Sequence, residues 1–114
     1  MMQDWNSYRA ALFERIGEFA ELTPDVMRGL NTVQDAAVKT GQLDSKTHEL
    51  IALAVAVTTR CDGCISVHAK KAVEFGATRA EVAEALGVAI ALNAGAALVY
   101  SSRVFDAMAA LPQA

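Results

Sequence analysis

The amino-acid sequence predicts an all-α fold, a single-domain helical bundle of about five to six helices spanning residues 1–114. The chain of 114 residues is the length of one small domain. Apolar residues make up 54% of it and aromatic residues only 6%, and 2 prolines and 7 glycines are its few helix breakers. Alanine, the best helix former, is abundant. This composition excludes an all-β sandwich.

Two helices are predicted before residue 42. In the first, Tyr8, Leu12 and Ile16 recur every 4 residues and form one apolar stripe. The second begins at Thr23-Pro24, where threonine can cap free backbone amides and proline at the first position loses no hydrogen bond. Gly41 supplies the left-handed residue that ends this helix.

The next two predicted helices flank a turn. Asp44 or Ser45 caps the third helix, which contains eight consecutive apolar residues over 50–57. Because this run leaves no polar face, we expect the third helix to be the most buried. The fourth helix starts near Asp62 and stops at Gly76.

The last part of the chain is predicted to form one helix, a break and another helix. Thr78-Arg79-Ala80-Glu81 is a capping box that opens the first of these. Asn93-Ala94-Gly95 is the expected break, where Asn93 would satisfy backbone groups. The last helix ends at Leu111-Pro112.

Charge and hydropathy disfavour nucleic-acid binding, secretion and membrane insertion. The net charge of −3 disfavours nucleic acid as a partner. Charged residues are scattered through Met1 to Ala20, so no secretory signal is predicted and we expect a cytoplasmic protein. The longest apolar stretch, Leu86 to Tyr100, is too short to span a membrane and is expected to be buried in protein. Because a domain this small buries only about two-thirds of its extended surface, that stretch and Leu50 to Val57, both too apolar to face water, predict a homo-oligomer.

The residues capable of chemistry cluster around two cysteines. Cys61 and Cys64 lie three positions apart at the start of a helix, close enough for a disulfide to form. Backbone amides at that helix N-terminus favour a thiolate. His68 follows Cys64 by four residues on the same face and can exchange the thiol proton. Glu49, on the preceding helix, could orient the imidazole of His68.

Other interpretations of these residues remain open. The cysteines could be two buried, inert thiols. Cys61, Cys64 and His68 could also bind zinc, with His48 or Glu49 as the fourth ligand. Glu49 could be only a first-turn carboxylate that the helix dipole favours. His48 has no partner in the pattern and is expected to be exposed.

Glu49, Cys61-x-x-Cys64 and His68 resemble the Glu…Cys-x-x-Cys-x-x-x-His motif of the AhpD-like alkylhydroperoxidases, in the carboxymuconolactone decarboxylase superfamily. The likeness is close over Leu43 to Phe75. It implies an all-helical peroxidase that cycles a Cys61–Cys64 disulfide. Cys64 would attack the hydroperoxide and Cys61 would resolve the sulfenic acid, while His68 and Glu49 would relay protons.

The resemblance also implies partners. A dithiol, such as the lipoyl group of a lipoylated protein, would reduce the disulfide, and the chain would form trimers or hexamers. No cofactor and no metal is implied. One departure is that AhpD has a histidine between its cysteines, where this chain has Gly63. A thiol–disulfide oxidoreductase without peroxidase activity and a Cys/His metal-binding helical protein are the alternatives.

Overall fold

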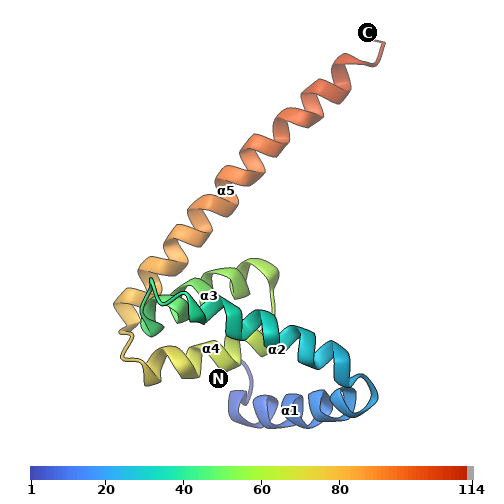
Figure 1. Ribbon diagram of the computed structural model, residues 1–114. Helices are drawn as coiled ribbons and strands as arrows, with labels where there is room; N and C mark the ends of the chain where they lie inside the picture. Colours follow the sequence, from blue (N-terminus) through green and yellow to red (C-terminus); the bar gives the residue numbers. More distant parts are fainter. Residues whose placement is uncertain (113–114) are drawn as a thin grey trace.

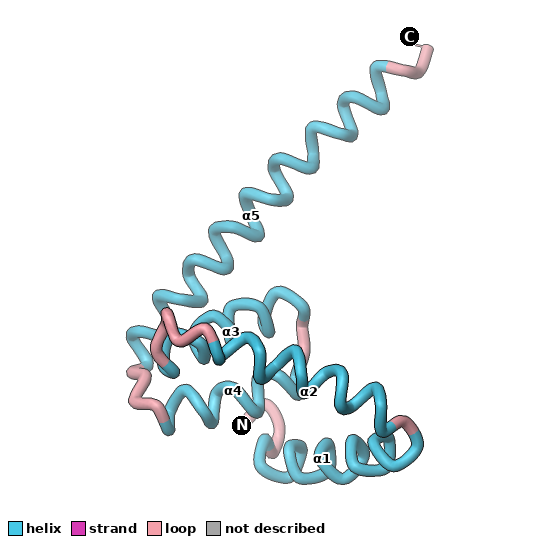
Figure 2. The backbone as a smooth tube through the Cα atoms, in the orientation of Figure 1, coloured by secondary structure: helices cyan, strands magenta, loops and turns pink. Residues whose placement is uncertain are grey.

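The computed structural model describes residues 1–112, and within them it contains helices and no strand. Figures 1 and 2 show the elements in order. The helices are α1 (Trp5–Leu22), α2 (Pro24–Lys39), α3 (Ser45–Thr59), α4 (Asp62–Glu74) and α5 (Arg79–Ala109). The predicted all-α class is therefore confirmed, with one helix fewer than the upper number expected.

The core lies where α3 packs against α4 and against the first turns of α5. Its four buried apolar side chains are small apart from one leucine, which lets the helices approach closely. They are Leu53, Ala56, Ala72 and Ala89. As predicted, α3 contributes more buried residues than any other helix. Its apolar run is not enclosed on all sides, because Ile51 and Val55 remain about half exposed.

Local capping sets the helix starts where the sequence predicts them. The Asp44 carboxylate accepts a hydrogen bond from the Thr47 amide at 2.7 Å at the start of α3. At the start of α5, Thr78 and Glu81 form both hydrogen bonds of the capping box. Lys46 then joins the two starts through an ion pair with Glu81 at 2.7 Å. The starts of α3 and α5 therefore lie next to each other.

The prediction that Thr23 caps the backbone amides of α2 is wrong. Thr23 precedes α2, but its side chain makes no capping hydrogen bond there. Its hydroxyl instead donates to the Phe19 carbonyl at 2.9 Å, at the end of α1. The Thr23 hydroxyl therefore satisfies a carbonyl at the end of α1 and leaves the first amides of α2 without a side-chain cap.

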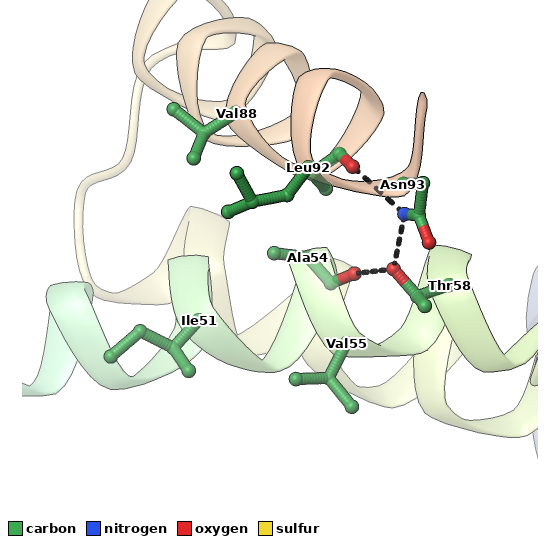
Figure 3. Close-up of a pocket in the computed structure, with 8 residues that line it drawn as sticks. Ile51, Ala54, Val55, Thr58, Val88, Leu92 and Asn93 are labelled. Carbon is green, nitrogen blue, oxygen red and sulfur yellow. Dashed lines mark hydrogen bonds between the residues drawn. The ribbon is translucent and has the colours of Figure 1, made fainter. Parts of the chain in front are cut away.

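The predicted break at Asn93-Ala94-Gly95 is also wrong, because α5 runs through it without interruption. The Asn93 side chain donates to the Ala89 carbonyl at 2.8 Å and to the Thr58 hydroxyl at 2.9 Å (Figure 3). With both acceptors in place, the side-chain amide of Asn93 does not draw hydrogen bonds away from the backbone of α5. Gly95 is tolerated inside the helix at a cost of about 1 kcal/mol.

Beyond Asn93, α5 leaves the rest of the molecule and extends into solvent (Figure 1). At 31 residues it is about 46 Å long. The prediction that Leu86 to Tyr100 is buried fails in the single chain, because only the first part of α5 contacts α3. The outer half carries a series of exposed apolar side chains: Leu98, Val99, Tyr100, Val104, Phe105 and Met108. Among the described residues, α5 alone has the length and apolar composition that a membrane-crossing helix requires.

Apolar surface is left uncovered elsewhere as well. The apolar stripe of α2, formed by Val26, Leu30 and Val33, is at least half exposed. The accessible surface of 8947 Å² compares with about 6,000 Å² for a compact chain of this mass. The radius of gyration of 19.0 Å compares with about 13 Å. This single chain therefore does not enclose its own core.

We expect further copies of the chain to cover these surfaces, in a trimer or hexamer. Static light scattering at micromolar concentration tests this expectation, and a stable monomer would contradict it. Phe105→Asp, which adds a charge at a side chain 75% exposed in the single chain, should shift the mass towards the monomer.

Candidate active site

The two cysteines lie at the turn between α3 and α4. Arg60 adopts the left-handed conformation that ends α3, and Cys61 is the N-cap of α4. The Cys61 sulfur accepts a hydrogen bond from the Cys64 backbone amide at 3.2 Å. Both thiols are free and half-buried. The prediction of a Cys-x-x-Cys pair at a helix N-terminus is thus confirmed.

The pKa values of the two thiols are shifted in opposite directions. Hydrogen bonds from the Cys64 thiol and the Cys64 backbone amide lower the pKa of Cys61 from its usual value, although nearby Asp62 opposes them. The hydrogen bond to Cys61, followed by burial, raises the pKa of Cys64. When the reduced pair loses one proton, Cys61 is therefore the thiol that gives it up more readily. Cys64, which the resemblance implies to be the attacking thiol, is the one that keeps its proton longer.

Glu49 and His68 meet beside this pair. The side chains of Glu49 on α3 and His68 on α4 are 2.6 Å apart, measured from Oε2 to Nδ1. Glu49 is only 8% exposed, and its carboxylate lies in the core region of α3. When Nδ1 donates to this carboxylate, the other imidazole nitrogen, Nε2, is left unprotonated and can accept a proton. His68 lies one helical turn after Cys64, so both project from the same side of α4.

The metal-site alternative finds no support in this geometry. Within residues 1–112, no three His, Cys, Asp or Glu side chains are grouped so that they could hold a metal ion. His48 is half-buried, which corrects the expectation that it is exposed. Its neighbour Glu49 carries the contact to α4, since adjacent helical residues point in different directions.

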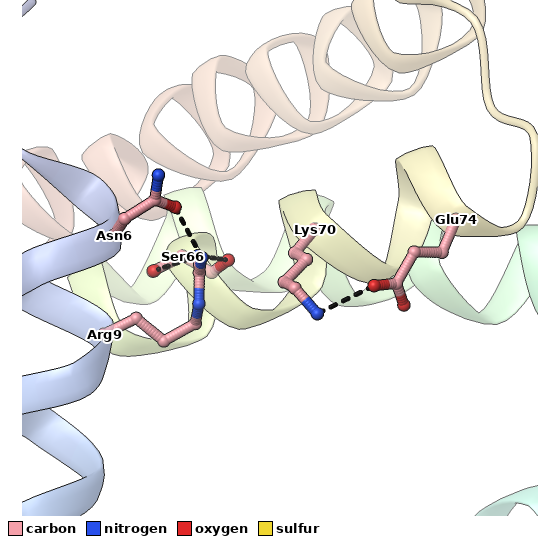
Figure 4. Close-up of polar contacts among 5 residues, drawn as sticks. All are labelled: Asn6, Arg9, Ser66, Lys70 and Glu74. Carbon is pink, nitrogen blue, oxygen red and sulfur yellow. Dashed lines mark hydrogen bonds and ion pairs between the residues drawn. The ribbon is translucent and has the colours of Figure 1, made fainter.

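Hydrogen bonds that the sequence does not predict connect α1 to α4, the helix that begins at the dithiol. Arg9 of α1 donates to the Ser66 hydroxyl at 3.0 Å and to the Ser66 carbonyl at 3.2 Å (Figure 4). Ser66 is 3% exposed, and its hydroxyl donates in turn to the Trp5 carbonyl at 3.4 Å. The contact joins residues 57 positions apart, so no local pattern predicts it.

Helix α1 explains why glycine lies between the cysteines. A Cβ atom built on Gly63 would lie 2.7 Å from a terminal methyl of Leu12 on α1. Because real Cβ atoms do not approach so closely, the end of the Leu12 side chain would have to move before any side chain could stand at position 63. A histidine there, as between the cysteines of AhpD, would have to displace the Leu12 side chain.

We expect Gly63→His to destabilise the fold by about 1 to 3 kcal/mol because the imidazole must displace the Leu12 side chain. Gly63→Ala should cost much less, since the Leu12 methyl can rotate away from a single methyl group. Adding Leu12→Ala to Gly63→His should recover part of the loss. Urea unfolding of the four proteins measures these differences, and equal stabilities for the histidine and alanine variants would contradict the account.

Fold and site together define a class: small all-α proteins in which a dithiol at a helix N-terminus is followed, one turn later, by a histidine that contacts a buried glutamate. The model of the carboxymuconolactone decarboxylase family matches residues 24–107. The chain therefore belongs to this family, as its resemblance implied. The matched region contains all four candidate residues, Glu49, Cys61, Cys64 and His68.

Three relatives illustrate the similarity. An uncharacterized protein of Haemophilus influenzae is 50% identical over 107 residues, which cover 94% of this chain and 95% of the relative. A carboxymuconolactone decarboxylase family protein of Legionella pneumophila, solved in its apo form, superposes with a TM-score of 0.73 at 36% identity, covering 90% and 92% of the two chains. A protein of Methanobacterium thermoautotrophicum gives a TM-score of 0.67 at 36% identity, covering 75% and 98%.

Proposed function

We propose that this protein is a thiol-dependent hydroperoxide reductase, an alkylhydroperoxidase that cycles a disulfide between Cys61 and Cys64. One observation carries the proposal: His68, whose imidazole contacts Glu49 of α3, lies on α4 one turn after Cys64, a thiol with a raised pKa. A peroxide-reducing thiol must lose a proton before it attacks, and the leaving alkoxide must gain one. An imidazole held by a carboxylate can perform both transfers.

The first step oxidises Cys64. His68 Nε2 takes the Cys64 proton, and Glu49 stabilises the resulting imidazolium. The Cys64 thiolate then attacks the terminal oxygen of the hydroperoxide. A sulfur–oxygen bond forms, the oxygen–oxygen bond breaks, and the alkoxide takes the proton from His68 to leave as an alcohol. Cys64 is now a sulfenic acid, and the peroxide has been reduced by two electrons.

The second step closes the disulfide. Cys61 has the lowered pKa of the pair and its sulfur accepts the Cys64 amide, so it is the thiol that ionises more readily to attack the sulfenic sulfur. The sulfur–sulfur bond forms as hydroxide leaves and is protonated to water. An external dithiol then returns two electrons and two protons and becomes a disulfide itself. The resemblance favours a lipoylated protein as this reductant.

A second candidate function is thiol–disulfide exchange without peroxide reduction. It is favoured by the position of Cys61, whose sulfur caps α4 and has a lowered pKa. A thiolate at the first cysteine of such a motif attacks external disulfides. In this reaction Cys61 forms the mixed disulfide, and Cys64 then displaces the bound partner.

Stoichiometric oxidation distinguishes the two candidates. The reduced protein is treated with one equivalent of tert-butyl hydroperoxide, and its free thiols are counted before and after the reaction. Loss of two thiols, with release of one alcohol, supports the reductase. Retention of both thiols, together with rapid oxidation by a small disulfide, supports exchange alone. Turnover with lipoyl, glutathione or thioredoxin reducing systems then identifies the reductant.

A further inference from the structure

The turn before the dithiol contains an unusual backbone conformation. Arg60 has φ of 56° and ψ of 50°, and no other described residue apart from glycine has a positive φ. The two other left-handed positions, at the turns following α2 and α4, are occupied by Gly41 and Gly76. Glycine adopts this conformation freely, whereas a residue with a Cβ atom is strained in it. Within residues 1–112, a residue other than glycine thus takes the strained left-handed conformation only at the turn that leads into Cys61.

The conformation itself is required by the way α3 ends. The backbone amides of Arg60 and Cys61 both donate to the Ala56 carbonyl, which closes the helix as the chain reverses. Glycine or asparagine would make the same hydrogen bonds with less strain. The arginine side chain gives no packing in return, because it is exposed. Its guanidinium has neither an ion pair nor a hydrogen bond to any residue of 1–112.

Strain that brings no internal contact is typical of functional sites. Here the strained residue is an exposed cation that directly precedes Cys61, in a chain whose net charge is −3. Asp62 follows Cys61 in the chain, so a positive residue precedes this cysteine and a negative residue follows it. An incoming anion is repelled by the chain as a whole and by Asp62. Arg60 is the adjacent group that can attract it.

We propose that Arg60 binds a carboxylate of the molecule that reacts with the dithiol, and so selects carboxylate-bearing disulfides or hydroperoxides. The planar guanidinium donates two parallel hydrogen bonds that match the two oxygens of a carboxylate. Arg60 is a specificity-determining residue in this role and takes no part in bond making. The inference rests on the dithiol reactivity of the proposed function, but it does not require peroxide reduction.

Three disulfide reagents of different charge test this role. They are 5,5′-dithiobis(2-nitrobenzoate), which carries two carboxylates, neutral 4,4′-dithiodipyridine and cationic cystamine. Each oxidises the reduced protein to the Cys61–Cys64 disulfide and is itself reduced to two thiols, so the first rate can be followed without peroxide. Arg60→Asn removes the charge but tolerates the left-handed conformation. Arg60→Lys keeps the charge without the planar fork.

At low ionic strength, we expect Arg60→Asn to react about threefold to fivefold more slowly with the dicarboxylate and at an unchanged rate with the neutral reagent. Its rate with cystamine should rise. Arg60→Lys should retain part of the preference for the dicarboxylate. Arg79→Gln, an equal change of net charge at the start of α5, is the matched control and should leave all ratios unaltered.

Two outcomes would overturn the proposal. Arg60→Asn could slow all three reagents equally, which would indicate a structural role, or it could leave the ratios as they are. Thermal unfolding separates structure from selection, because relief of strain should leave the midpoint of Arg60→Asn equal to or above that of the unmodified protein. A protein that consumes no peroxide but shows the charge preference would disprove the reductase and leave this inference intact.

Discussion

Replacement of His68 by alanine is expected to slow the attack on hydroperoxide at pH 7 by about 10² to 10⁴-fold, the usual contribution of general acid–base catalysis. The loss follows from the raised pKa of Cys64, which keeps this thiol protonated unless a base removes the proton. Stopped-flow measurement of the first oxidation gives the rate directly. A loss of less than about threefold would mean that the proton relay does not operate.

The pH dependence of this variant is the more specific observation. Without a base, the Cys64 thiolate forms only as the pH approaches the raised pKa of the thiol, so the rate of His68→Ala should climb steadily on the alkaline side. The unmodified protein should respond much less over the same range. Glu49→Gln keeps the size of the side chain but removes its charge. This variant should lose less of the rate at pH 7 and should also recover rate as the pH is raised.

Exchange of each cysteine for serine should separate the roles of the two thiols. Cys64→Ser is expected to abolish peroxide reduction, since the attacking sulfur is gone. Cys61→Ser should complete the first oxidation and then accumulate a sulfenic acid on Cys64, because no resolving thiol remains. Trapping with dimedone, followed by mass spectrometry of the labelled peptide, identifies the oxidised residue.

The reverse result has a clear structural meaning. If Cys61→Ser blocks the first oxidation while Cys64→Ser still reacts, then the capping thiolate of Cys61 is the nucleophile towards peroxide. The lowered pKa of Cys61 would then outweigh the proximity of His68 to Cys64. The peroxidase would operate in the thioredoxin order, and the relay variants at His68 and Glu49 would have little effect.

The sequence predicts those parts of the fold that depend on neighbouring residues. Asp44 accepts the Thr47 amide, and Thr78 pairs with Glu81, because each cap needs only groups three positions apart. Asn93 was interpreted as a break because its acceptor Thr58 lies 35 positions away. A side chain that interrupts an isolated helix can thus be accommodated when another helix supplies its partner.

In the candidate site, too, contacts within one helix could be predicted from the sequence, whereas contacts between helices depend on how the helices pack. Cys61, Cys64 and His68 follow from spacing along one helix, so their common side could be predicted. The contact between Glu49 and His68 depends on how α3 and α4 align, which the spacing suggested and the structure supplies. The contact of Leu12 with Gly63 could not be predicted, because it depends on where α1 crosses the turn.

The capping role of Cys61 also links the electrochemistry of the pair to the stability of α4. In the reduced protein the Cys61 sulfur is a helix cap, which is worth about 0.5 to 2 kcal/mol when the cap is a strong acceptor. A disulfide sulfur is a poorer acceptor than a thiolate, so oxidation weakens this hydrogen bond. The reduced form is thereby favoured, and the midpoint potential of the couple becomes less negative by about 10 to 40 mV. The hydrogen bond at the start of α4 thus makes the Cys61–Cys64 disulfide a stronger oxidant.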